Sequence, residues 1–251
     1  MTFSHVTASP QPPLQPPSED RLPRGLTLLI DADDTLWENN IYFDEVVVQY
    51  VAFVERHGGR GEDARAKLLE IERERTKRFG YGVDNFRLSL KAACEHLLQG
   101  RAYQDEVTVL DELCSGLRRR AILLLPGVDD TLRDLASRHR LILVTKGDHD
   151  DQLSKVSRSG LRSRFHEVDV VAEKDAPTYR ELVRRHGLDS ERTWMIGNSP
   201  KSDILPALEA SLRAVFIPHA ATWTLELMEL PPVSDGRMLV VERFTDLTSH
   251  F

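Results

Sequence analysis

The sequence predicts an α/β protein built on a doubly wound parallel sheet, with an all-helical segment inserted after the first strand. Short apolar runs rich in β-branched residues alternate with helical patterns along most of the chain. The alternation breaks once, between residues 38 and 124, where every pattern is helical. Alternating strands and helices favour a parallel sheet covered on both faces, because each crossover helix packs back onto the sheet.

Five strands are expected from the apolar runs Leu26–Ile30, Leu141–Val144, Val168–Ala172, Trp194–Ile196 and Ala214–Ile217. One helix between them should begin after Asp175 as N-cap, with Pro177 in its first turn, and end at Gly187. Four further helices are expected between residues 38 and 124, from apolar stripes over 43–54, 68–75, 86–97 (after Asp84 as N-cap) and 107–117. Residues 25–37 and 125–251 would then form the α/β core.

The composition of the 251 residues narrows the class of protein. Apolar residues make up 41%, and no apolar run approaches the roughly 18 residues that a membrane-spanning helix needs. The formal net charge of −7 argues against non-specific binding to nucleic acid or anionic membranes, because both are polyanions. Cys94 and Cys114 lie on apolar helical stripes without metal-ligand spacing, so we expect buried thiols and a cytoplasmic protein.

Residues 1–24 contain six of the chain's 13 prolines and no apolar stretch behind a basic start. Proline at this density cannot enter a helix interior or a sheet, which predicts a flexible tail. The spacing of Pro13 and Pro16 also fits a PxxP ligand for a partner domain.

The first strand opens into Asp31-Ala32-Asp33-Asp34-Thr35. Alternation in an extended segment points Asp31 and Asp33 to the same side. Two neighbouring carboxylates repel each other and need a cation, a shared proton or solvent, and Mg²⁺ prefers such oxygen ligands. The alternative is a polar turn that caps a helix.

Three later strands also end in polar residues, at Thr145-Lys146-Gly147-Asp148, at Lys174, and at Asn198 with Asp203. A hydroxyl beside a glycine can donate to a phosphate oxygen, and a lysine can offset phosphate charge. Taken singly, Thr145 could belong to a turn, Lys174 could be a solvated surface lysine and Asp203 could cap a helix. Because the carboxyl ends of parallel strands share one edge, together they predict a ligand site there.

These motifs resemble those of the haloacid dehalogenase superfamily, in its phosphatase branch. They read DADDTLW at 31–37, VTKGD at 144–148, Lys174 in VVAEKDAPTYREL, and IGNSPKSD at 196–203. The resemblance covers the chain from residue 26 to about 219. It implies a Rossmann-like core with a helical cap, residues 38–124, inserted between the first and second motifs.

The resemblance also implies roles for the motif residues. Asp31 would be the nucleophile and form an aspartyl phosphate, and Asp33 would be the general acid–base. Lys174 would neutralise charge shared by phosphate and Asp31. Substrate phosphate would be held by the second motif, through Thr145, Lys146 and the Gly147 backbone. Mg²⁺ would be bound by the Asp31 side chain, the Asp33 carbonyl and the fourth motif, with Asn198 and Asp203 as its candidate ligands.

Two positions need separate comment. The fourth motif usually begins Gly-Asp, whereas Asn198 stands at the second position here, so we expect weaker metal binding. The segment around Gly80-Tyr81-Gly82 suits a cap loop that reaches the active site, with Tyr81 as a substrate-binding residue. The alternative is an ordinary turn whose aromatic residues pack on the cap.

The resulting hypothesis is a Mg²⁺-dependent phosphomonoester hydrolase that acts on a small phosphorylated metabolite. A 2-haloacid dehalogenase would also use Asp31 as nucleophile but would need no metal, and it has no use for the second carboxylate, Asp33. A catalytically weak member that binds phosphate or protein is the third possibility, to which Asn198 gives some weight.

Overall fold

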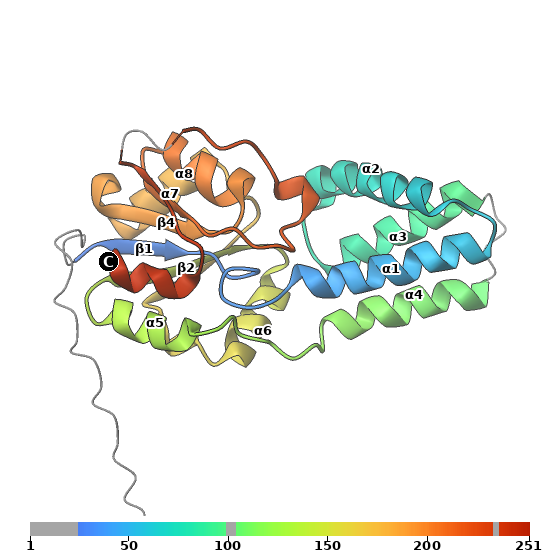
Figure 1. The fold of residues 1–251 in the computed structure, drawn as a ribbon, viewed down its shortest axis with the longest axis horizontal. Coiled ribbons are helices and arrows are strands. Elements are labelled where there is room, and N and C mark those ends of the chain that lie inside the picture. Colours follow the sequence, from blue (N-terminus) through green and yellow to red (C-terminus); the bar gives the residue numbers. More distant parts are fainter. Residues whose placement is uncertain (1–24, 99–103, 233–235) are drawn as a thin grey trace, which may run out of the picture.

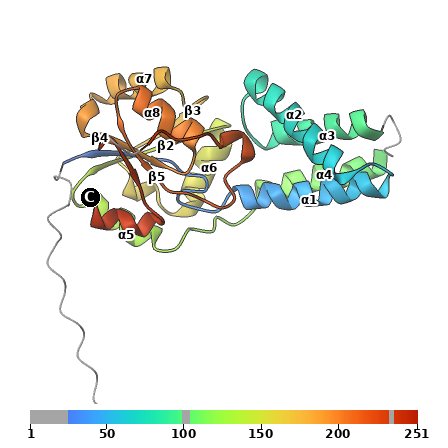
Figure 2. The same ribbon diagram turned by 45° about the horizontal axis from the view of Figure 1, so that its top comes forward.

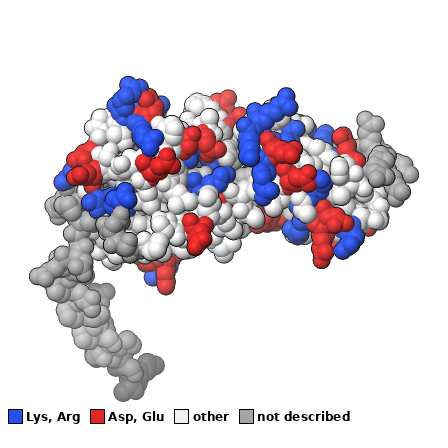
Figure 3. Space-filling model, turned by 90° about the horizontal axis from the view of Figure 1, so that it is seen from above, with Lys and Arg blue, Asp and Glu red and all other residues white. Residues whose placement is uncertain are grey.

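The computed structural model describes residues 25–98, 104–232 and 236–251. The predicted tail, residues 1–24, lies outside the described residues. No helix in the described part of the chain is long and apolar enough to cross a membrane. Figure 3 shows acidic and basic side chains intermixed over one face of the molecule.

A six-stranded parallel sheet forms the centre of the core (Figure 1). Its strands are β1 (Thr27–Ile30), β2 (Arg140–Lys146), β3 (Glu167–Val171), β4 (Thr193–Gly197), β5 (Arg213–Phe216) and β6 (Met238–Val240). The strand order is β3-β2-β1-β4-β5-β6, and every neighbouring pair is parallel. The five predicted strands are confirmed, and β6 is an additional edge strand. The order reverses between β1 and β4, where doubly wound sheets bind ligands.

Both faces of the sheet are covered by helices (Figure 1). One layer contains α5 (Val128–Ala136) and α6 (His149–Ser159), and the opposite layer contains α7 (Ala176–His186) and α8 (Leu205–Glu209). Successive strand residues alternate between the two layers: Leu28 and Ile30 pack with α5 and α6, whereas Leu29 packs with α7 and α8. This two-sided burial explains the nearly continuous apolar strands of the sequence.

The ends of α7 follow from local chemistry. The Asp175 side chain accepts a hydrogen bond from the Thr178 amide (2.8 Å), which satisfies one of the free N–H groups of the first turn. Gly187 ends the helix with φ 62°, a left-handed conformation that glycine adopts without strain. Both predicted boundaries are confirmed.

Four helices form a separate bundle, here called the helical subdomain, at one end of the sheet (Figure 2). They are α1 (Asn40–Arg56), α2 (Gly61–Phe79), α3 (Val83–Leu98) and α4 (Gln104–Leu117). Tyr50, Leu68, Leu90 and Cys114 belong to its own hydrophobic core, distinct from the clusters on the sheet. The subdomain therefore packs around a hydrophobic core of its own.

Two expectations about the helical segment have different outcomes. Asp84 was expected to cap α3, but the helix begins one residue earlier and Asp84 lies in its first turn. There the Asp84 carboxylate forms an ion pair with Arg118 (2.9 Å), which lies outside α3, instead of capping the helix. Cys94 and Cys114 are both buried free thiols, as expected.

The two connections between core and subdomain run side by side. The Glu38 amide donates to the Leu123 carbonyl and the Leu125 amide to the Leu36 carbonyl, both at 2.9 Å. Trp37, which is fully buried, forms a bridge with Leu124 at the same place. The chain therefore passes between core and subdomain through two paired segments at one place.

Candidate active site

The carboxyl ends of β1, β2 and β4, with the loop after β3, open into a cavity of about 210 Å³ that the helical subdomain closes from the other side. The predicted site residues that line this cavity are Asp31, Asp33, Tyr81, Thr145, Lys146, Gly147, Lys174, Asn198 and Asp203. The sheet topology places those strand ends next to one another and so brings together all of these residues except Tyr81, which comes from the loop between α2 and α3.

Lys174 joins two of the carboxylates. Its ammonium lies 2.5 Å from Asp31 Oδ1 and 2.8 Å from Asp203 Oδ1, and all three residues are buried. Burial raises the pKa of Asp31 to about 7, because Lys174 only partly offsets burial and the negative charge of Asp203 adds to it. Burial alone would lower the pKa of Lys174, but the charges of Asp203 and Asp31 outweigh it and raise that pKa.

The second oxygen of Asp31 is also held. The Thr35 hydroxyl donates to Asp31 Oδ2 (2.8 Å) and lies 3.3 Å from Asn198 Oδ1. The Asn198 amide nitrogen donates to the Thr222 hydroxyl (2.9 Å), which turns the amide oxygen toward Thr35 and Asp31. At Gly197 an added Cβ would overlap with the Asp203 carboxylate, so only glycine permits this close approach.

The donor set fits a divalent cation. When both are ionised, Asp31 and Asp203 carry two negative charges against the one positive charge of Lys174, so this buried group then has a net negative charge. Carboxylate and amide oxygens are the ligand atoms that Mg²⁺ prefers. Both Asp203 oxygens already accept hydrogen bonds, from Lys174 and from the Ser199 amide (2.9 Å). Both Asp31 oxygens accept hydrogen bonds as well, so this criterion does not rank the two carboxylates, and both stay candidate ligands together with the Asn198 amide oxygen.

Asp33 lies in a different electrostatic environment. Its carboxylate accepts hydrogen bonds from Lys155 (2.8 Å), Gln152 (3.0 Å) and the Trp37 indole (2.7 Å). Burial would raise the pKa of Asp33, but the charge of Lys155 and these hydrogen bonds outweigh burial and lower it. The arrangement stabilises the carboxylate, which is the form that accepts a proton. Lys155 and Gln152, which lie on α6 after the second motif, were not identified from the sequence.

The second motif is partly engaged within the protein. Thr145 is buried and lines the cavity. The Lys146 ammonium donates to Ser202 Oγ (2.6 Å) and to Glu226 Oε1 (2.9 Å). The Gly147 amide donates to the Val171 carbonyl at 3.3 Å. Of the three residues expected to hold phosphate, the Thr145 hydroxyl therefore has the fewest competing contacts.

The Gly80–Gly82 loop of the subdomain reaches the core. The Tyr81 hydroxyl donates to Glu173 Oε2 (2.8 Å), and the Lys146 ammonium lies 4.0 Å from the centroid of the Tyr81 ring. A Cβ added at Gly82 would lie 3.3 Å from the Asp148 Cβ, so the loop backbone also lies close to the second motif. These contacts with the core favour the loop interpretation over an ordinary turn.

Glu226, in the loop after β5, is a further residue that no motif indicated. Its carboxylate accepts from Lys146, from Ser199 Oγ (2.6 Å) and from Ser202 Oγ. Burial would raise the pKa of Glu226, but the charge of Lys146 and these hydrogen bonds lower it to about 2. Glu226 thus connects the second motif to the fourth.

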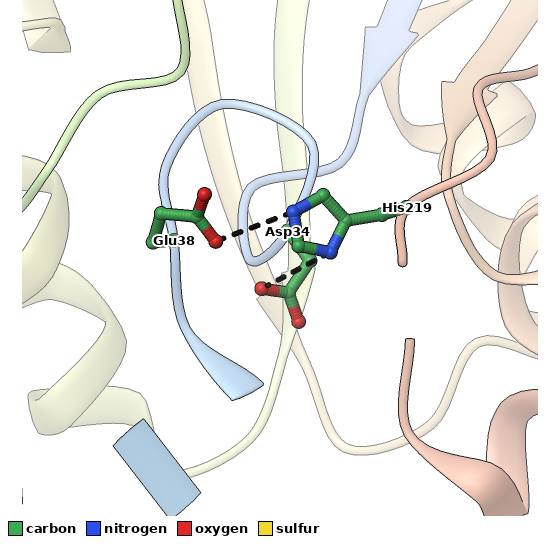
Figure 4. A group of neighbouring side chains, drawn as sticks. All are labelled: Asp34, Glu38 and His219. Carbon is green, nitrogen blue, oxygen red and sulfur yellow. Dashed lines mark ion pairs between the residues drawn. The ribbon is translucent and has the colours of Figure 1, made fainter. Parts of the chain in front are cut away.

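A second cluster lies beside the loop that follows β1 (Figure 4). His219 Nε2 lies 3.2 Å from Glu38 Oε2, and His219 Nδ1 lies 3.8 Å from Asp34 Oδ1. The side chains of Asp34, Glu38 and His219 lie close enough together to hold a metal ion. However, Asp34 Oδ1 already accepts the Asn39 amide (2.8 Å) and the Asn40 amide (3.0 Å) at the start of α1. The cluster ties the loop after β1 to the loop after β5.

Comparison with known proteins identifies the family to which the chain belongs. Residues 26–211 match the family described as haloacid dehalogenase-like hydrolase. Over 98 residues the chain is 35% identical to glyceraldehyde 3-phosphate phosphatase of Methanothermobacter thermautotrophicus, a match that covers 37% of this chain and spans only 43% of that relative.

Solved structures share the fold. A haloacid dehalogenase-like family hydrolase from Xanthomonas campestris is 26% identical, with a TM-score of 0.78 over 89% of this chain and 93% of its own. L-2-haloacid dehalogenase from Xanthobacter autotrophicus is 17% identical, with a TM-score of 0.60 over 89% and 96%. The likeness to the dehalogenase concerns the fold alone.

Proposed function

The chain belongs to the haloacid dehalogenase-like hydrolases, and we propose that it hydrolyses phosphate monoesters of small metabolites through an aspartyl phosphate on Asp31. The observation that carries the proposal is the placement of Asp33 in the same cavity as the Asp31–Lys174 pair. Phosphoryl transfer to a carboxylate needs a nucleophile, a cation beside it and a second group that exchanges protons. These three groups are Asp31, Lys174 and Asp33.

In the first half-reaction an Asp31 oxygen attacks phosphorus and the bond from phosphorus to the leaving alcohol breaks. Lys174 stabilises the negative charge on the transferring group, and the Thr145 hydroxyl donates to one of its oxygens. A protonated Asp33 would give its proton to the leaving oxygen.

In the second half-reaction water attacks the aspartyl phosphate, and Asp33 takes the proton of that water. The pair with Lys155 favours this half-reaction, because it keeps Asp33 ionised. The first half-reaction needs the protonated form, which Lys155 opposes. Lys155 therefore sets the balance between the two half-reactions.

The Asp31 carboxylate, the Asp33 carbonyl and the Asn198 amide oxygen would hold Mg²⁺, with Asp203 holding Lys174 in place. When bound, the cation would neutralise charge on the phosphoryl group. We further propose that the helical subdomain acts as a cap, residues 38–124, that selects the substrate. The contacts of Tyr81 with Glu173 and Lys146 support this role.

The test is release of phosphate from p-nitrophenyl phosphate with and without Mg²⁺. We expect metal-dependent turnover that Asp31→Asn abolishes, because an amide has nearly the same shape but is not a nucleophile. Asp130→Asn is the matched control, because Asp130 is an exposed residue of α5. Turnover in the chelated wild type, or wild-type turnover in Asp31→Asn, would contradict the proposal.

A dehalogenase of the same fold is the second candidate, because it would use the same nucleophile, Asp31. It predicts metal-independent release of halide from 2-chloropropionate and no phosphatase activity. The half-buried Asp33–Lys155 pair in the cavity argues against it, because dehalogenation needs no second carboxylate that protonates an alkoxide. Measuring both reactions on one preparation separates the two candidates.

A further inference from the structure

The wall of the cavity opposite Asp31 is built by the helical subdomain and carries only negative charge. The subdomain residues that line it include Phe43, Asp44, Glu72, Tyr81, Asn85 and Phe86. Asp44 and Glu72 are its only charged side chains among the described lining residues. A substrate that reaches from Asp31 to this wall therefore meets two carboxylates and no cation of the lining.

Glu72 is the more informative of the two. Glu72 is only 9% exposed, and no described residue forms a hydrogen bond or ion pair with its carboxylate. Burial raises the pKa of Glu72 to about 7, and the negative charge of Asp44 adds to this effect. An unpartnered carboxylate is expensive to bury, so its retention beside a ligand cavity indicates a partner that arrives with the ligand.

The lysines of the cavity are already engaged with carboxylates of the core. Its lining contains three lysines, all on the core side, and each one pairs with a core carboxylate: Lys146 with Glu226, Lys155 with Asp33 and Lys174 with Asp31. On α2, Arg75 donates to Asn85 (3.1 Å) and lies over the Phe79 ring. The positive charge of Arg65 lowers the pKa of Asp44, but burial outweighs this effect and raises that pKa.

The apolar part of the same wall suits a cation as well. Phe43 and Phe86 line the cavity and pack edge to face, with ring centroids 5.0 Å apart. Aromatic rings attract ammonium groups through their negative faces, and they also accommodate a short alkyl chain.

We propose that the subdomain wall is a subsite for an ammonium group, with Glu72 as its principal contact and Asp44 as its second. This inference rests on the proposed phosphatase function and narrows its substrate class to phosphate monoesters whose leaving alcohol carries a protonated amine. The phosphate lies at Asp31 and the amine at Glu72. The competing possibility is a neutral, protonated Glu72 that hydrogen-bonds a hydroxyl of an uncharged substrate.

The experiment compares pairs of esters that differ only in charge. A series of ω-aminoalkyl phosphates of increasing length is paired with n-alkyl and ω-hydroxyalkyl phosphates of the same number of heavy atoms. The readout is the ratio of kcat/KM within each pair, which is insensitive to a general loss of activity. The same pairs are titrated calorimetrically into Asp31→Asn, which reports binding without turnover.

We expect the wild type to prefer the amine by about tenfold or more at one chain length, the magnitude of a charge-assisted contact. Glu72→Gln should reduce the ratio to near unity, and Asp44→Asn should reduce it in part. Glu74→Gln is the matched control, because it makes the same change at an exposed position of α2, and it should leave the ratio unchanged.

Three outcomes would overturn the subsite: a ratio near unity at every length, a preference that persists when Glu72→Gln and Asp44→Asn are combined, or a preference for the hydroxyalkyl ester. The wild-type comparison alone can give the first and third of these, whether or not the variants fold. Failure of the phosphatase function looks different: no ester turns over, p-nitrophenyl phosphate included, while calorimetry still shows the preference for the amine.

Discussion

Replacing Glu226 by glutamine tests the contact between the second and fourth motifs. The Glu226 carboxylate is buried and accepts hydrogen bonds from Lys146, Ser199 and Ser202. Gln has nearly the same shape but no charge, so Glu226→Gln leaves the Lys146 ammonium with only the more distant Glu173 carboxylate, at 3.3 Å, as a charged partner. The expected loss of stability is therefore mainly electrostatic.

The magnitude follows from the pKa of Glu226. Folding lowers it from 4.5 to about 2, which corresponds to about 3 kcal/mol of stabilisation near neutral pH. Because the folded-state pKa is the lower one, this stabilisation is present above the unfolded-state pKa. It is lost as the pH falls from 4.5 toward 2, so that about 1 kcal/mol remains near pH 3.

The assay is urea denaturation of wild type and Glu226→Gln near pH 7 and near pH 3. We expect the difference in the free energy of unfolding to shrink from about 3 to about 1 kcal/mol between these conditions. Glu229→Gln, an exposed position in the same loop, is the control and should change stability by less than about 0.5 kcal/mol. A Glu226→Gln variant as stable as wild type near pH 7, or a loss that does not depend on pH, would refute the reasoning.

Three other predictions concern the site. Asn198→Asp should tighten Mg²⁺ binding by about 1 to 3 kcal/mol, because it adds a charge beside Asp31; a calorimetric titration with unchanged or weaker affinity would show that Asn198 is not a ligand. Lys155→Gln should move the acidic limb of the pH–kcat profile to higher pH, because removing the ammonium raises the pKa of Asp33. Lys155→Arg keeps the positive charge and should leave the limb in place. An unmoved limb in Lys155→Gln would show that the limb does not report the ionisation of Asp33. Tyr81→Ala should lower kcat/KM for metabolite-sized esters, by an amount equivalent to about 1 to 3 kcal/mol of activation free energy, because the loop contacts the remote part of the substrate. The effect on p-nitrophenyl phosphate should be smaller. Tyr81→Phe isolates the hydrogen bond to Glu173, and equal losses for all substrates would indicate misfolding of the subdomain.

The sequence predicted the parts of the molecule that local patterns determine. The strands that contain Ile30 and Ile196 are buried on both faces, so their apolar runs are unambiguous. The Asp175 cap and the Gly187 stop also act within a few residues. The polar strand ends converge because parallel strands place equivalent ends at one edge, which follows from topology once the alternation is recognised.

Residues that act through tertiary contacts could not be found in this way. Lys155 has the sequence of an ordinary helix-surface lysine, and only the packing of α6 brings it to Asp33. Glu226 lies in a loop without a motif, 80 residues from its partner Lys146. Glu72 sits among alternating charges that indicate a solvated helix face, and its burial depends on how α2 packs against its neighbours. β6 is too short for its apolar run to be distinctive.

The most direct test of the central claim is to trap the phosphorylated enzyme. Wild type is mixed with radiolabelled phosphate ester and Mg²⁺, quenched in acid during turnover, digested and analysed by mass spectrometry. Nucleophilic attack by Asp31 predicts one phosphoryl group on the peptide that contains Asp31, lost on treatment with hydroxylamine and absent from Asp31→Asn. Label on any other residue, or turnover of the ester without phosphorylation of Asp31, would contradict it.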